Sequence, residues 1–578
     1  MKYMNFSNAS CKNCYKCLRS CPVKAIRFKN QQAEIVEERC IGCGHCLEVC
    51  PQNAREIVSD LEKVKNLIAS EKNVIASIAP SFPGYFNIEE GKIVAVLKKL
   101  GFDFIEETAV GAEIVSNFYS EYVEKNKDTA YITTCCPSAN YLVEKYFPEL
   151  VPYMIPAVSP MIAHGQILKS IYGKESFVIF IGPCAAKKIE AGSVKNNKFI
   201  DAVLTFEEIN QWILESKIDM EEIKREEINK CGEKRGHNYP VDGGIIEAVK
   251  DELEKKQLQG ISVSGTEDCI NILKSMKSGT LKSVFVEMSV CKGSCIGGSN
   301  MVNNQQDYYE KLQKVKKYIK KRENASKDKK FDKNTLKVLT SYINLNKSFR
   351  DKSIKIANVE EADIKRIMRE MGKFEPKDEL NCGVCGYNTC REKAKAIYQG
   401  MAETDMCLHF MRSKAERLTN VIFENTASSV ILIDEELNVK EINPAAQEVF
   451  MVEAENIKGK PVAALINDED FRKVKETGNS IIGKKVEYPQ YNAVFIENIV
   501  YLPKQNLVLA SMINIVEEEK NKEELIRVKE NTLNAAEEVI EKQMRVAQEI
   551  AGLLGETTAE TKVILNKLRK VVAGEDKH

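Results

Sequence analysis

The sequence predicts a multidomain protein in which a small cysteine-rich domain is followed by a central α/β domain, a second small cysteine-rich domain, a cysteine-free α/β domain and a C-terminal helix. At roughly 100–200 residues per domain, 578 residues suggest three to five domains. The cysteines fall into three groups, at positions 11–50, 135–295 and 382–407, and none follows Cys407. Residues 60–300 alternate short apolar runs with helical patterns, as α/β domains do.

The charge balance and the hydropathy exclude two classes of function. Lys plus Arg and Asp plus Glu both number 84, so the sequence does not indicate a chain-wide basic surface for nucleic acid. No uncharged apolar run approaches the roughly 18 residues of a membrane span, and the first ten residues lack the apolar stretch of a signal peptide. We therefore expect a cytoplasmic protein with reduced thiols, whose 19 cysteines serve metal or redox chemistry.

Two N-terminal cysteine runs each have the spacing Cys-x2-Cys-x2-Cys-x3-Cys-Pro, the run of bacterial two-cluster ferredoxins, in which the fourth cysteine binds the other cluster. The alternative is a zinc module, but four tetrahedral zinc ligands do not require this repeated pattern. An α+β ferredoxin domain with two 4Fe–4S clusters is therefore expected in residues 1–60. One cluster would be held by Cys11, Cys14, Cys17 and Cys50, and the other by Cys40, Cys43, Cys46 and Cys21.

The cysteines of the central domain, residues 61–350, follow predicted buried strands. Cys135 and Cys136 follow YITT, Cys184 follows VIFIGP, and Cys291 and Cys295 follow VFVEMSV. The strand ends of α/β domains carry functional sites. The predicted strands are Val74–Ala79, Ala130–Thr134, Phe177–Gly182, Ala202–Thr205 and Val284–Met288, and the predicted helices include Asp60–Ser70 and Glu90–Leu100.

Three loops carry a resemblance to a known family. TTCCPS at 133–138, GPCAAKKIE at 182–190 and EMSVCKGSCIGG at 287–298 resemble the signature loops of the iron-only (FeFe) hydrogenase large subunit, in the same order and with the same internal spacing. The preceding ferredoxin module matches the usual N-terminal extension of that family. The resemblance covers about residues 1–350.

The resemblance implies an H-cluster, which is a 4Fe–4S cluster linked to a two-iron subcluster with CO, cyanide and a dithiolate with a central amine (azadithiolate). Cys295 would also bridge to the two-iron subcluster, Cys135 would relay protons to its amine, and Lys187 would hydrogen-bond a cyanide. The 4Fe–4S ligands would be Cys136, Cys184, Cys291 and Cys295, and the pocket would be lined by Ala79, Pro80, Ser81, Ser159 and Pro160.

Elementary chemistry gives these roles a physical reason. A buried ammonium stabilises an anionic cyanide through a charge-assisted hydrogen bond, which suits Lys187. A thiol close to a base can pass on a proton, which suits Cys135. A free cysteine is also often just a small buried apolar residue. That reading stays open for Cys135 and is the one given to Cys231 and Cys269, which fit no motif.

The sequence departs from the catalytic members of the family at two places. Gly182 and Ser289 occupy the positions of methionines beside the two-iron site. Phe118, Tyr119 and Tyr122 stand where the family has proton-relaying glutamates, and a phenol with a pKa near ~10 is a weak carrier. Glu287 and Glu247 are candidates for a replacement route, or are structural acids. These departures indicate slow turnover, which suits a sensor.

A third cysteine set lies in residues 351–415. Its spacing, Cys382-x2-Cys385-x4-Cys390-x16-Cys407, resembles the single-cluster 4Fe–4S domain found with corrinoid iron–sulfur proteins, although Leu408 replaces the usual proline after the last cysteine. The stretch Arg391–Gly400 is predicted as a helix. Four thiolates also suit zinc, which remains the alternative.

Residues 416–516 resemble a PAS domain, an α/β sensor and dimerisation module. The resemblance rests on IDEELNVKEINPAAQEVF, where Asn443-Pro444 opens a helix, and on the strand-like runs KKVEYPQ, NAVFIENIV and LVLASMINI. The domain has no cysteine, and no histidine occurs between 410 and 577, so the common haem and flavin attachment residues are missing. We expect no tightly attached cofactor there.

Residues 517–578 are predicted to form a helical signalling tail. Apolar residues at a spacing of three and four indicate a helix pair or a coiled-coil dimer, and the alternative is one helix that folds back on its own domain. The lysine-rich segment 312–335 is interpreted as a solvated helix and linker rather than a nucleic-acid patch. The apolar positions of the tail are Leu533, Ala536, Ile540, Ala547, Ile550, Leu554, Ile564 and Leu568, interrupted by Gln543, Thr557 and Thr561.

The sequence thus predicts a sensory iron-only hydrogenase that interconverts H2 with protons and electrons. It would carry three 4Fe–4S clusters besides the H-cluster, exchange electrons with a redox protein such as ferredoxin, form a homodimer, and signal to a protein partner through the tail. Two alternatives stay open: a catalytic subunit of an electron-transfer complex, and a non-catalytic hydrogenase-like protein of iron–sulfur assembly.

Overall fold

The computed structural model describes residues 4–6, 10–30, 32–70, 72–126, 129–193, 199–219, 222–229, 234–301, 306–326, 343–354, 358–551 and 559–572. It divides the chain into two compact units, Met1–Phe410 and Met411–His578, here called the first and second unit. Cys231, Leu554 and Thr557 lie outside the described residues, as does the end of the lysine-rich segment.

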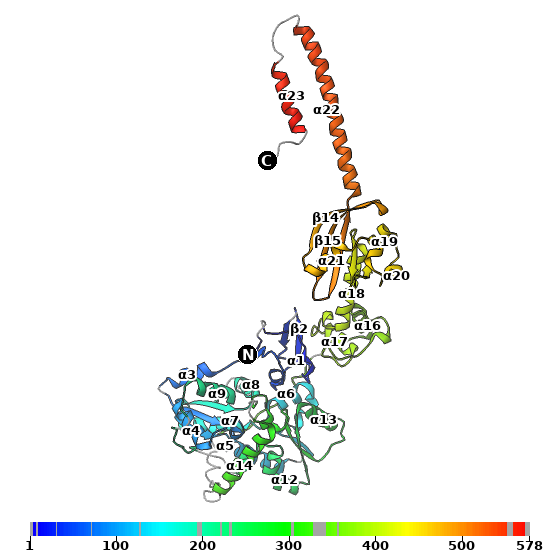
Figure 1. The fold of residues 1–578 in the computed structure, drawn as a ribbon. Coiled ribbons are helices and arrows are strands. Elements are labelled where there is room, and N and C mark those ends of the chain that lie inside the picture. The colour runs from blue at the N-terminus through cyan, green and yellow to red at the C-terminus, as the bar shows by residue number, and fades with distance from the viewer. Residues whose placement is uncertain are drawn as a thin grey trace. The chain divides into compact units, whose positions relative to one another are not determined.

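Parallel strands in two sheets form the centre of the first unit (Figure 1). One sheet has the order β6-β5-β8-β9 and the other β10-β11-β7, and all neighbours in both are parallel. The five predicted strands are confirmed, and two unpredicted strands join them at the sheet edges. The strands are β5 (Val74–Ile78), β6 (Phe104–Glu107), β7 (Ala130–Ile132), β8 (Phe177–Gly182), β9 (Ala202–Thr205), β10 (Gln259–Ser264) and β11 (Val284–Ser289).

Helices pack against these sheets and close one large apolar core around β5 and β8. The two predicted helices are confirmed as α3 and α4, within two residues of the expected ends. Helices α5, α6, α8, α9 and α13 each come next after a strand, as βα alternation requires, whereas α10, α11 and α12 follow one another between β9 and β10. The helices are α3 (Leu61–Ile68), α4 (Glu90–Lys99), α5 (Ala109–Lys125), α6 (Pro137–Tyr146), α7 (Pro160–Tyr172), α8 (Ala186–Ser193), α9 (Phe206–Glu215), α10 (Lys234–His237), α11 (Gly244–Ala248), α12 (Lys250–Lys255), α13 (Thr266–Lys277) and α14 (Tyr308–Ser326).

The N-terminal cysteine-rich part is a small α+β module with two antiparallel pairs of strands. β1 (Met4–Phe6) pairs with β4 (Arg55–Ile57), and β2 (Ile26–Lys29) pairs with β3 (Gln32–Ile35), both antiparallel. The short helices α1 (Lys16–Arg19) and α2 (His45–Glu48) lie inside the two cysteine runs. Gly44 precedes α2 with a φ of 76°, a left-handed conformation that glycine adopts without strain.

The segment 343–354, here called the return segment, runs back along the central domain before the chain enters the second cysteine-rich domain. Leu345 accepts a hydrogen bond from the amide of Val158 at 2.9 Å, and the Lys347 amide donates to Pro156 at 3.0 Å. The second cysteine-rich domain then contains α16 (Glu361–Glu370) and α17 (Cys390–Tyr398), which pack on each other. The helix predicted at Arg391–Gly400 is thereby confirmed as α17.

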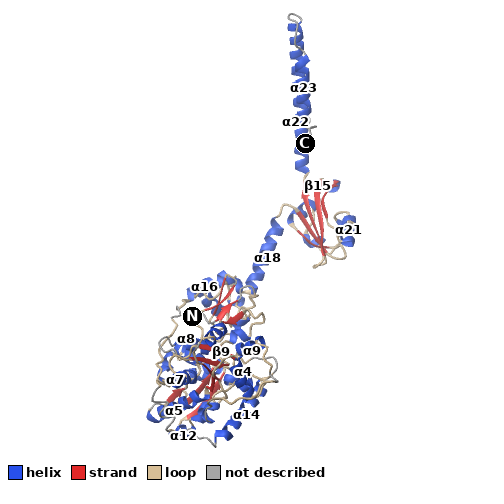
Figure 2. Cartoon of the chain, turned by 90° about the vertical axis from the view of Figure 1, so that its left-hand side faces the viewer, coloured by secondary structure: helices blue, strands red, loops and turns tan. Residues whose placement is uncertain are grey.

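The second unit contains a single antiparallel sheet of five strands in the order β13-β12-β16-β15-β14, with α21 packed against β15 and β16 (Figure 2). Asn443 caps α19 by accepting a hydrogen bond from the Ala446 amide, which confirms the predicted helix start. The elements are α18 (Leu408–Asn425), β12 (Ser429–Ile433), β13 (Val439–Ile442), α19 (Pro444–Phe450), α20 (Ala454–Ile457), α21 (Glu469–Thr477), β14 (Ile481–Tyr488), β15 (Ala493–Leu502) and β16 (Leu507–Asn514).

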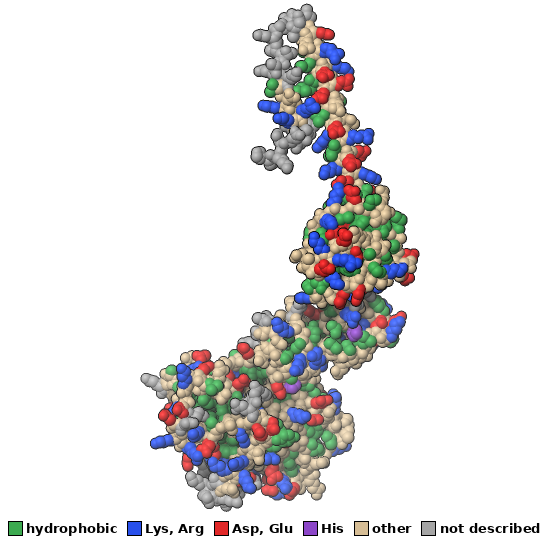
Figure 3. All heavy atoms as spheres, in the orientation of Figure 1, with side chains coloured by type: hydrophobic (Ala, Val, Ile, Leu, Met, Phe, Trp, Pro, Cys, Tyr) green, Lys and Arg blue, Asp and Glu red, His purple; other side chains and the backbone are tan. Residues whose placement is uncertain are grey.

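The tail forms two helices, α22 (Val516–Ala551) and α23 (Ala559–Val572), which contact each other. Arg569 of α23 forms an ion pair with Glu537 of α22 at 3.1 Å, so the second helix turns back along the first. Acidic and basic side chains are interspersed along α22 (Figure 3). None of the described helices is long and apolar enough to cross a membrane.

Candidate metal centres

A cavity of about 110 Å³ collects the cysteines of the three central loops. Cys135 and Cys136 follow β7, Cys184 follows β8, and the third pair follows β11, so the carboxyl ends of parallel strands bring them together. The 3-10 turn Ser294–Gly297 holds the last cysteine, and it is tight because a Cβ at Gly297 would lie 1.8 Å from the Lys292 carbonyl oxygen. The cavity is lined by Cys135, Cys136, Cys184, Cys291 and Cys295, among others.

The thiols in this cavity are placed where a thiolate is unfavourable without a bound cation. Burial raises the pKa of Cys184 to about 11 and that of Cys295 to about 12, and each thiolate raises the pKa of its neighbours further. A cluster of positive iron ions would offset this cost, and soft thiolates are the ligands that iron–sulfur clusters take. The donor set therefore fits an iron–sulfur centre.

Lys187 places an ammonium group in the wall of the same cavity. Its Nζ donates to Glu190 Oε2 at 2.7 Å and to the Cys135 carbonyl oxygen at 3.2 Å. Burial lowers the pKa of Lys187, but the Glu190 carboxylate raises it by more, so the pKa of the lysine is raised. Lys187 is therefore held as a cation beside the thiols, where an anionic ligand would be stabilised.

Glu190 is the carboxylate that keeps Lys187 in place. It is 1% exposed and also accepts hydrogen bonds from the Ser159 hydroxyl at 2.8 Å and from Lys347 of the return segment at 3.0 Å. Burial opposes ionisation, yet Lys187 and Lys347 together lower the pKa of Glu190 to about 2. Ser159, predicted to line the pocket, does not reach the cavity and acts on its wall through Glu190.

The loop Ala79–Ser81 and Pro160 line the cavity, as predicted. The Ser81 hydroxyl is buried and has no hydrogen-bond partner among the described residues. An unpaired buried hydroxyl is costly, so its presence at the cavity wall fits a polar ligand in the cavity.

Gly182 and Ser289, which stand at the two methionine positions, have identifiable neighbours in the structure. A Cβ at Gly182 would lie 2.6 Å from the ring of Phe180, so Phe180 fills the space that a larger side chain would need. Phe180 itself lines the cavity. Ser289 also lines it, and its hydroxyl lies 3.1 Å from that of Ser294.

Cys135 interacts electrostatically with Lys187 and Glu287, and it also acts on the phenol of Tyr119. Tyr119 accepts a hydrogen bond from the Thr134 amide at 2.9 Å, and burial raises the pKa of the tyrosine, with a further contribution from Cys135. Burial also raises the pKa of Cys135 well above its usual value. A protonated thiol beside a protonated phenol makes a poor proton path at neutral pH.

The N-terminal cysteines gather in the two sets expected from the crossed ferredoxin pattern. One set lines a single pocket together with Tyr15 and Arg55. In the other set, burial raises the pKa of Cys46 to about 12, and Cys40 and Cys21 add to the rise despite the nearby Arg55 guanidinium. The first set is Cys11, Cys14, Cys17 and Cys50, and the second is Cys21, Cys40, Cys43 and Cys46.

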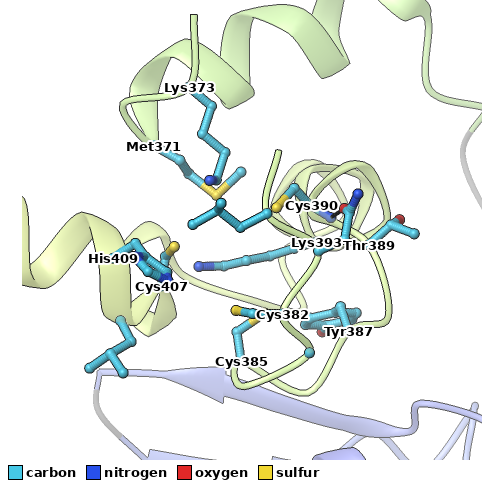
Figure 4. A pocket seen from close by; sticks show the side chains of 14 residues that line it. Met371, Lys373, Cys382, Cys385, Tyr387, Thr389, Cys390, Lys393, Cys407 and His409 are labelled. Carbon is cyan, nitrogen blue, oxygen red and sulfur yellow. Dashed lines mark hydrogen bonds between the residues drawn. The ribbon is translucent and has the colours of Figure 1, made fainter. Parts of the chain in front are cut away.

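The third cysteine set lines a separate pocket, and Lys393 reaches across it toward Cys407 (Figure 4). Among the described residues, no three His, Cys, Asp or Glu side chains meet the spacing of a single-ion site. The thiols surround a common pocket instead. The lining residues include Cys382, Cys385, Cys390 and Cys407.

Comparison with known families agrees with this geometry. Residues 72–299 match the family described as iron only hydrogenase large subunit, C-terminal domain, and residues 3–51 match the 4Fe-4S dicluster domain. Residues 378–409 match a family described as putative Fe-S cluster, and residues 417–482 match the PAS fold. Residues 72–299 are a domain of the iron-only hydrogenase family.

Individual relatives of the chain differ in what their names state. Iron hydrogenase 1 of Clostridium pasteurianum is 27% identical over 369 residues, which is 51% of this chain and 64% of that protein. The cytosolic Fe-S cluster assembly factor NAR1 of Yarrowia lipolytica is 25% identical over 218 residues, 32% of this chain and 44% of that protein. The chain thus spans less than two thirds of either curated relative. A solved FeFe-hydrogenase HydA1 variant from Chlamydomonas reinhardtii is 16% identical, with a TM-score of 0.41, over 51% of this chain and 100% of that one.

The two acids proposed for a replacement proton route lie in different surroundings. Glu287, on β11 of the hydrogenase domain, accepts backbone hydrogen bonds from Gly243, Ile245 and Ile246 at 2.9–3.0 Å, so it caps the start of α11. Burial raises the pKa of Glu287 to about 7 although these amides oppose the shift. Glu247 is exposed and lines a separate open hollow with Asp242 and Lys320, outside the cysteine cavity.

Three residues of these sites were not predicted from the sequence. Glu190 and Lys393 each lie three residues after a predicted site residue on the same helix. Residues three apart share a helix face, so this spacing could have identified them from the sequence. Lys347 reaches Glu190 from 157 positions away, which only the tertiary fold determines. Cys269 is buried, and its thiol donates to the Ser289 carbonyl oxygen at 3.3 Å, outside the cavity lining.

Proposed function

We propose that the protein is a sensory iron-only hydrogenase that reversibly interconverts H2 with protons and electrons and passes its redox state to the PAS domain and the tail. The observation that carries the proposal is one cavity that combines five cysteines with a buried, ion-paired lysine. Cys136, Cys184, Cys291 and Cys295 would hold the 4Fe–4S part of an H-cluster, with Cys295 as the bridge to the two-iron part.

When bound, the H-cluster supplies the iron at which hydrogen, protons and electrons interconvert. The chain's own residues bind and orient it. Lys187 offers an ammonium to an anionic ligand, and Glu190 fixes the direction of that ammonium through the 2.7 Å contact. Ser81 lines the same cavity, and its buried hydroxyl has no hydrogen-bond partner among the described residues.

We infer slow turnover from the residues around Cys135. The thiol would face the amine of a bound H-cluster, and Tyr119, which interacts electrostatically with this thiol, has a pKa that burial raises further above the phenol value of ~10. Proton transfer is efficient when the pKa of the carrier lies near the operating pH. A proton carrier whose pKa lies this far from neutral pH suits a sensor of hydrogen better than an enzyme that produces hydrogen in bulk.

Two other functions are considered for specific reasons. The likeness to an assembly factor and the loss of the methionines and relay acids favour a non-catalytic iron–sulfur protein. The ferredoxin module favours a catalytic subunit of an electron-transfer complex. Lys187 and the complete cysteine set support the hydrogenase reading over the first, and the PAS domain supports a sensor over the second.

Infrared spectroscopy of the reconstituted protein tests the proposal. The wild-type chain should show bands of CO and cyanide ligands, and Lys187→Met should shift or remove the cyanide bands. Lys188→Met is the matched control, because Lys188 is also buried on α8 but donates to Val203 at 2.7 Å, outside the cavity. Absence of all such bands from the wild type would contradict the hydrogenase function.

A further inference from the structure

The third cysteine pocket has a buried cation within it. Lys393 lies on α17 one turn after Cys390 and is 1% exposed, and its Nζ donates to the Thr404 carbonyl oxygen at 3.0 Å. Its charge interacts with Cys407, Cys385 and Cys390. Figure 4 shows the side chain reaching across the space that the four sulfurs surround.

A buried ammonium at this place changes the energy of a bound 4Fe–4S cluster. One-electron reduction adds a negative charge to the cluster, and a nearby cation in a poorly screened interior stabilises the reduced form more than the oxidised form. Net charge and hydrogen bonding around the sulfurs are among the factors that set cluster potentials. Lys393 should therefore raise the reduction potential of this cluster.

The pocket is packed directly against the ferredoxin module. Leu18, which lies between cysteines of the first run, packs closely on Gly386. A Cβ added at Gly386 would lie 2.8 Å from Leu18 Cγ. Lys24 donates to the Gly386 carbonyl oxygen at 2.9 Å and interacts electrostatically with both Cys21 and Cys385. Four more hydrogen bonds between described residues join the two parts: Arg19 to Val384, Phe28 to Met401, Asn30 to Glu403, and Arg39 to Gln399.

Another part of the ferredoxin module, around Gly42 and Cys43, packs against elements next to the hydrogenase cavity. A Cβ at Gly42 would lie 2.4 Å from Ile189 of α8, the helix that carries Lys187. Ser299 donates to the Cys43 carbonyl oxygen at 3.5 Å, and the Cys43 thiolate adds to the rise in the pKa of Cys291 that burial causes. The second ferredoxin cluster site is therefore close both to the cavity and, through Cys21, to the third pocket.

We propose that the third cluster takes its electron from the ferredoxin module across the Leu18–Gly386 contact, and that Lys393 makes it the preferred resting place of that electron. In this step one ferredoxin-module cluster is oxidised by one electron and the third cluster is reduced by one electron. The proposal rests on the proposed function for the source of the electrons, which H2 oxidation supplies. Under this proposal, the second unit responds to the reduced form of the third cluster.

A redox titration followed by electron paramagnetic resonance tests the role of Lys393 without hydrogen. In the wild-type chain the third-cluster signal should appear before those of the ferredoxin module as the potential is lowered. At a fixed poise, Lys393→Met should reduce the ratio of reduced to oxidised third cluster at least tenfold, a shift of about 59 mV. Lys395→Met, on the exposed face of the same helix, should leave the ratio unchanged.

A third cluster that is reduced last in the wild type would overturn the proposal even if Lys393→Met lost its cluster. An unchanged ratio in a cluster-loaded Lys393→Met chain would overturn it as well. Because dithionite and mediators set the potential, these outcomes do not depend on hydrogenase activity. Absence of CO bands would contradict the proposed function but not the role of Lys393.

The electron route is tested by spin relaxation. In the fully reduced chain, the third-cluster signal should relax rapidly because of neighbouring reduced clusters. Cys17→Ala combined with Cys46→Ala, which removes ligands of both ferredoxin clusters, should slow that relaxation. Relaxation that is unchanged by loss of the ferredoxin clusters, with third-cluster iron retained, would show that the third cluster is not in line with them.

Discussion

At the scale of single residues, the buried pair of Lys187 and Glu190 is extended by the partly exposed Lys347 into a chain of alternating charge. Glu190 contacts both lysines at 2.7–3.0 Å, and the Ser159 hydroxyl satisfies it further. Removing either member of the buried Lys187–Glu190 pair leaves an uncompensated charge and costs about 3–5 kcal/mol. The network therefore keeps Lys187 in place, as its proposed role toward a cyanide ligand requires.

Glu287 predicts a pH dependence of stability. Burial raises its folded-state pKa to about 7, whereas the unfolded value is near ~4.3. The folded state therefore keeps a proton that the unfolded state loses, so this contribution is fully present below ~pH 4.3 and is lost as the pH rises through about 7. The unfolding free energy should fall with rising pH across this window, by up to ~1.4 kcal/mol per pH unit.

Glu287→Gln should flatten this dependence, measured as the thermal midpoint of unfolding between about pH 5 and pH 7. The variant will also be less stable at every pH, since one amide oxygen cannot accept all three backbone hydrogen bonds. The slope rather than the offset is the test. The exposed Glu247→Gln serves as the control and should keep the wild-type slope, and an equal slope in both variants would contradict the assignment.

At the scale of elements, the return segment links the cavity wall to the second cysteine-rich domain. Lys347 contacts Glu190 beneath the cavity, while Lys352 of the same segment contacts Glu144 of α6 at 2.6 Å. Both lysines are partly exposed, with side-chain exposures of 28% and 35%. They differ in whether they reach the Lys187 network.

Lys347→Met should shift the cyanide infrared bands of the reconstituted protein, because Glu190 then has one cation and turns its second oxygen elsewhere. The expected loss of stability is modest, about 1 kcal/mol, since the lysine is part exposed. Lys352→Met should cost a similar amount and leave the bands in place. Equal spectra for the two variants would show that the return segment does not act on the site.

At the scale of the whole molecule, the chain separates into a first unit that holds every cysteine and a second unit that holds none. The second unit has its own apolar core, built around Phe450, Phe471 and Phe495. Its tail leaves apolar side chains exposed, among them Val539 and Val546 of α22. These features support separate folding of the two units and an interaction role for the tail.

A chain that ends at Phe410 should keep the infrared bands, with hydrogen oxidation within about twofold of the full chain, because the first unit is compact by itself. In the full chain, adding H2 should change the rate of amide hydrogen exchange in α22. In the oxidised state, the exchange rates of Lys393→Met should equal those of the wild type. Exchange in α22 that ignores hydrogen while the site is active would exclude the sensor function.

The sequence alone was sufficient for what depends on local pattern. The apolar runs located β5, β7, β8, β9 and β11, and the cysteine spacings grouped the thiols into sets that the structure also brings together. Asn443-Pro444 marked a helix start because a cap and an N1 proline act within one turn. Each of these signals depends on residues that are close in the chain.

The tertiary structure decided what depends on distant residues. The half-exposed β10 has no apolar run, and its place in the sheet comes from pairing with β11. Phe180 explains Gly182, Lys347 completes the Glu190 network, and Leu18 meets Gly386, although no local pattern connects these partners. Periodicity reports which side of an element is buried, but packing alone determines which side chain lies against it.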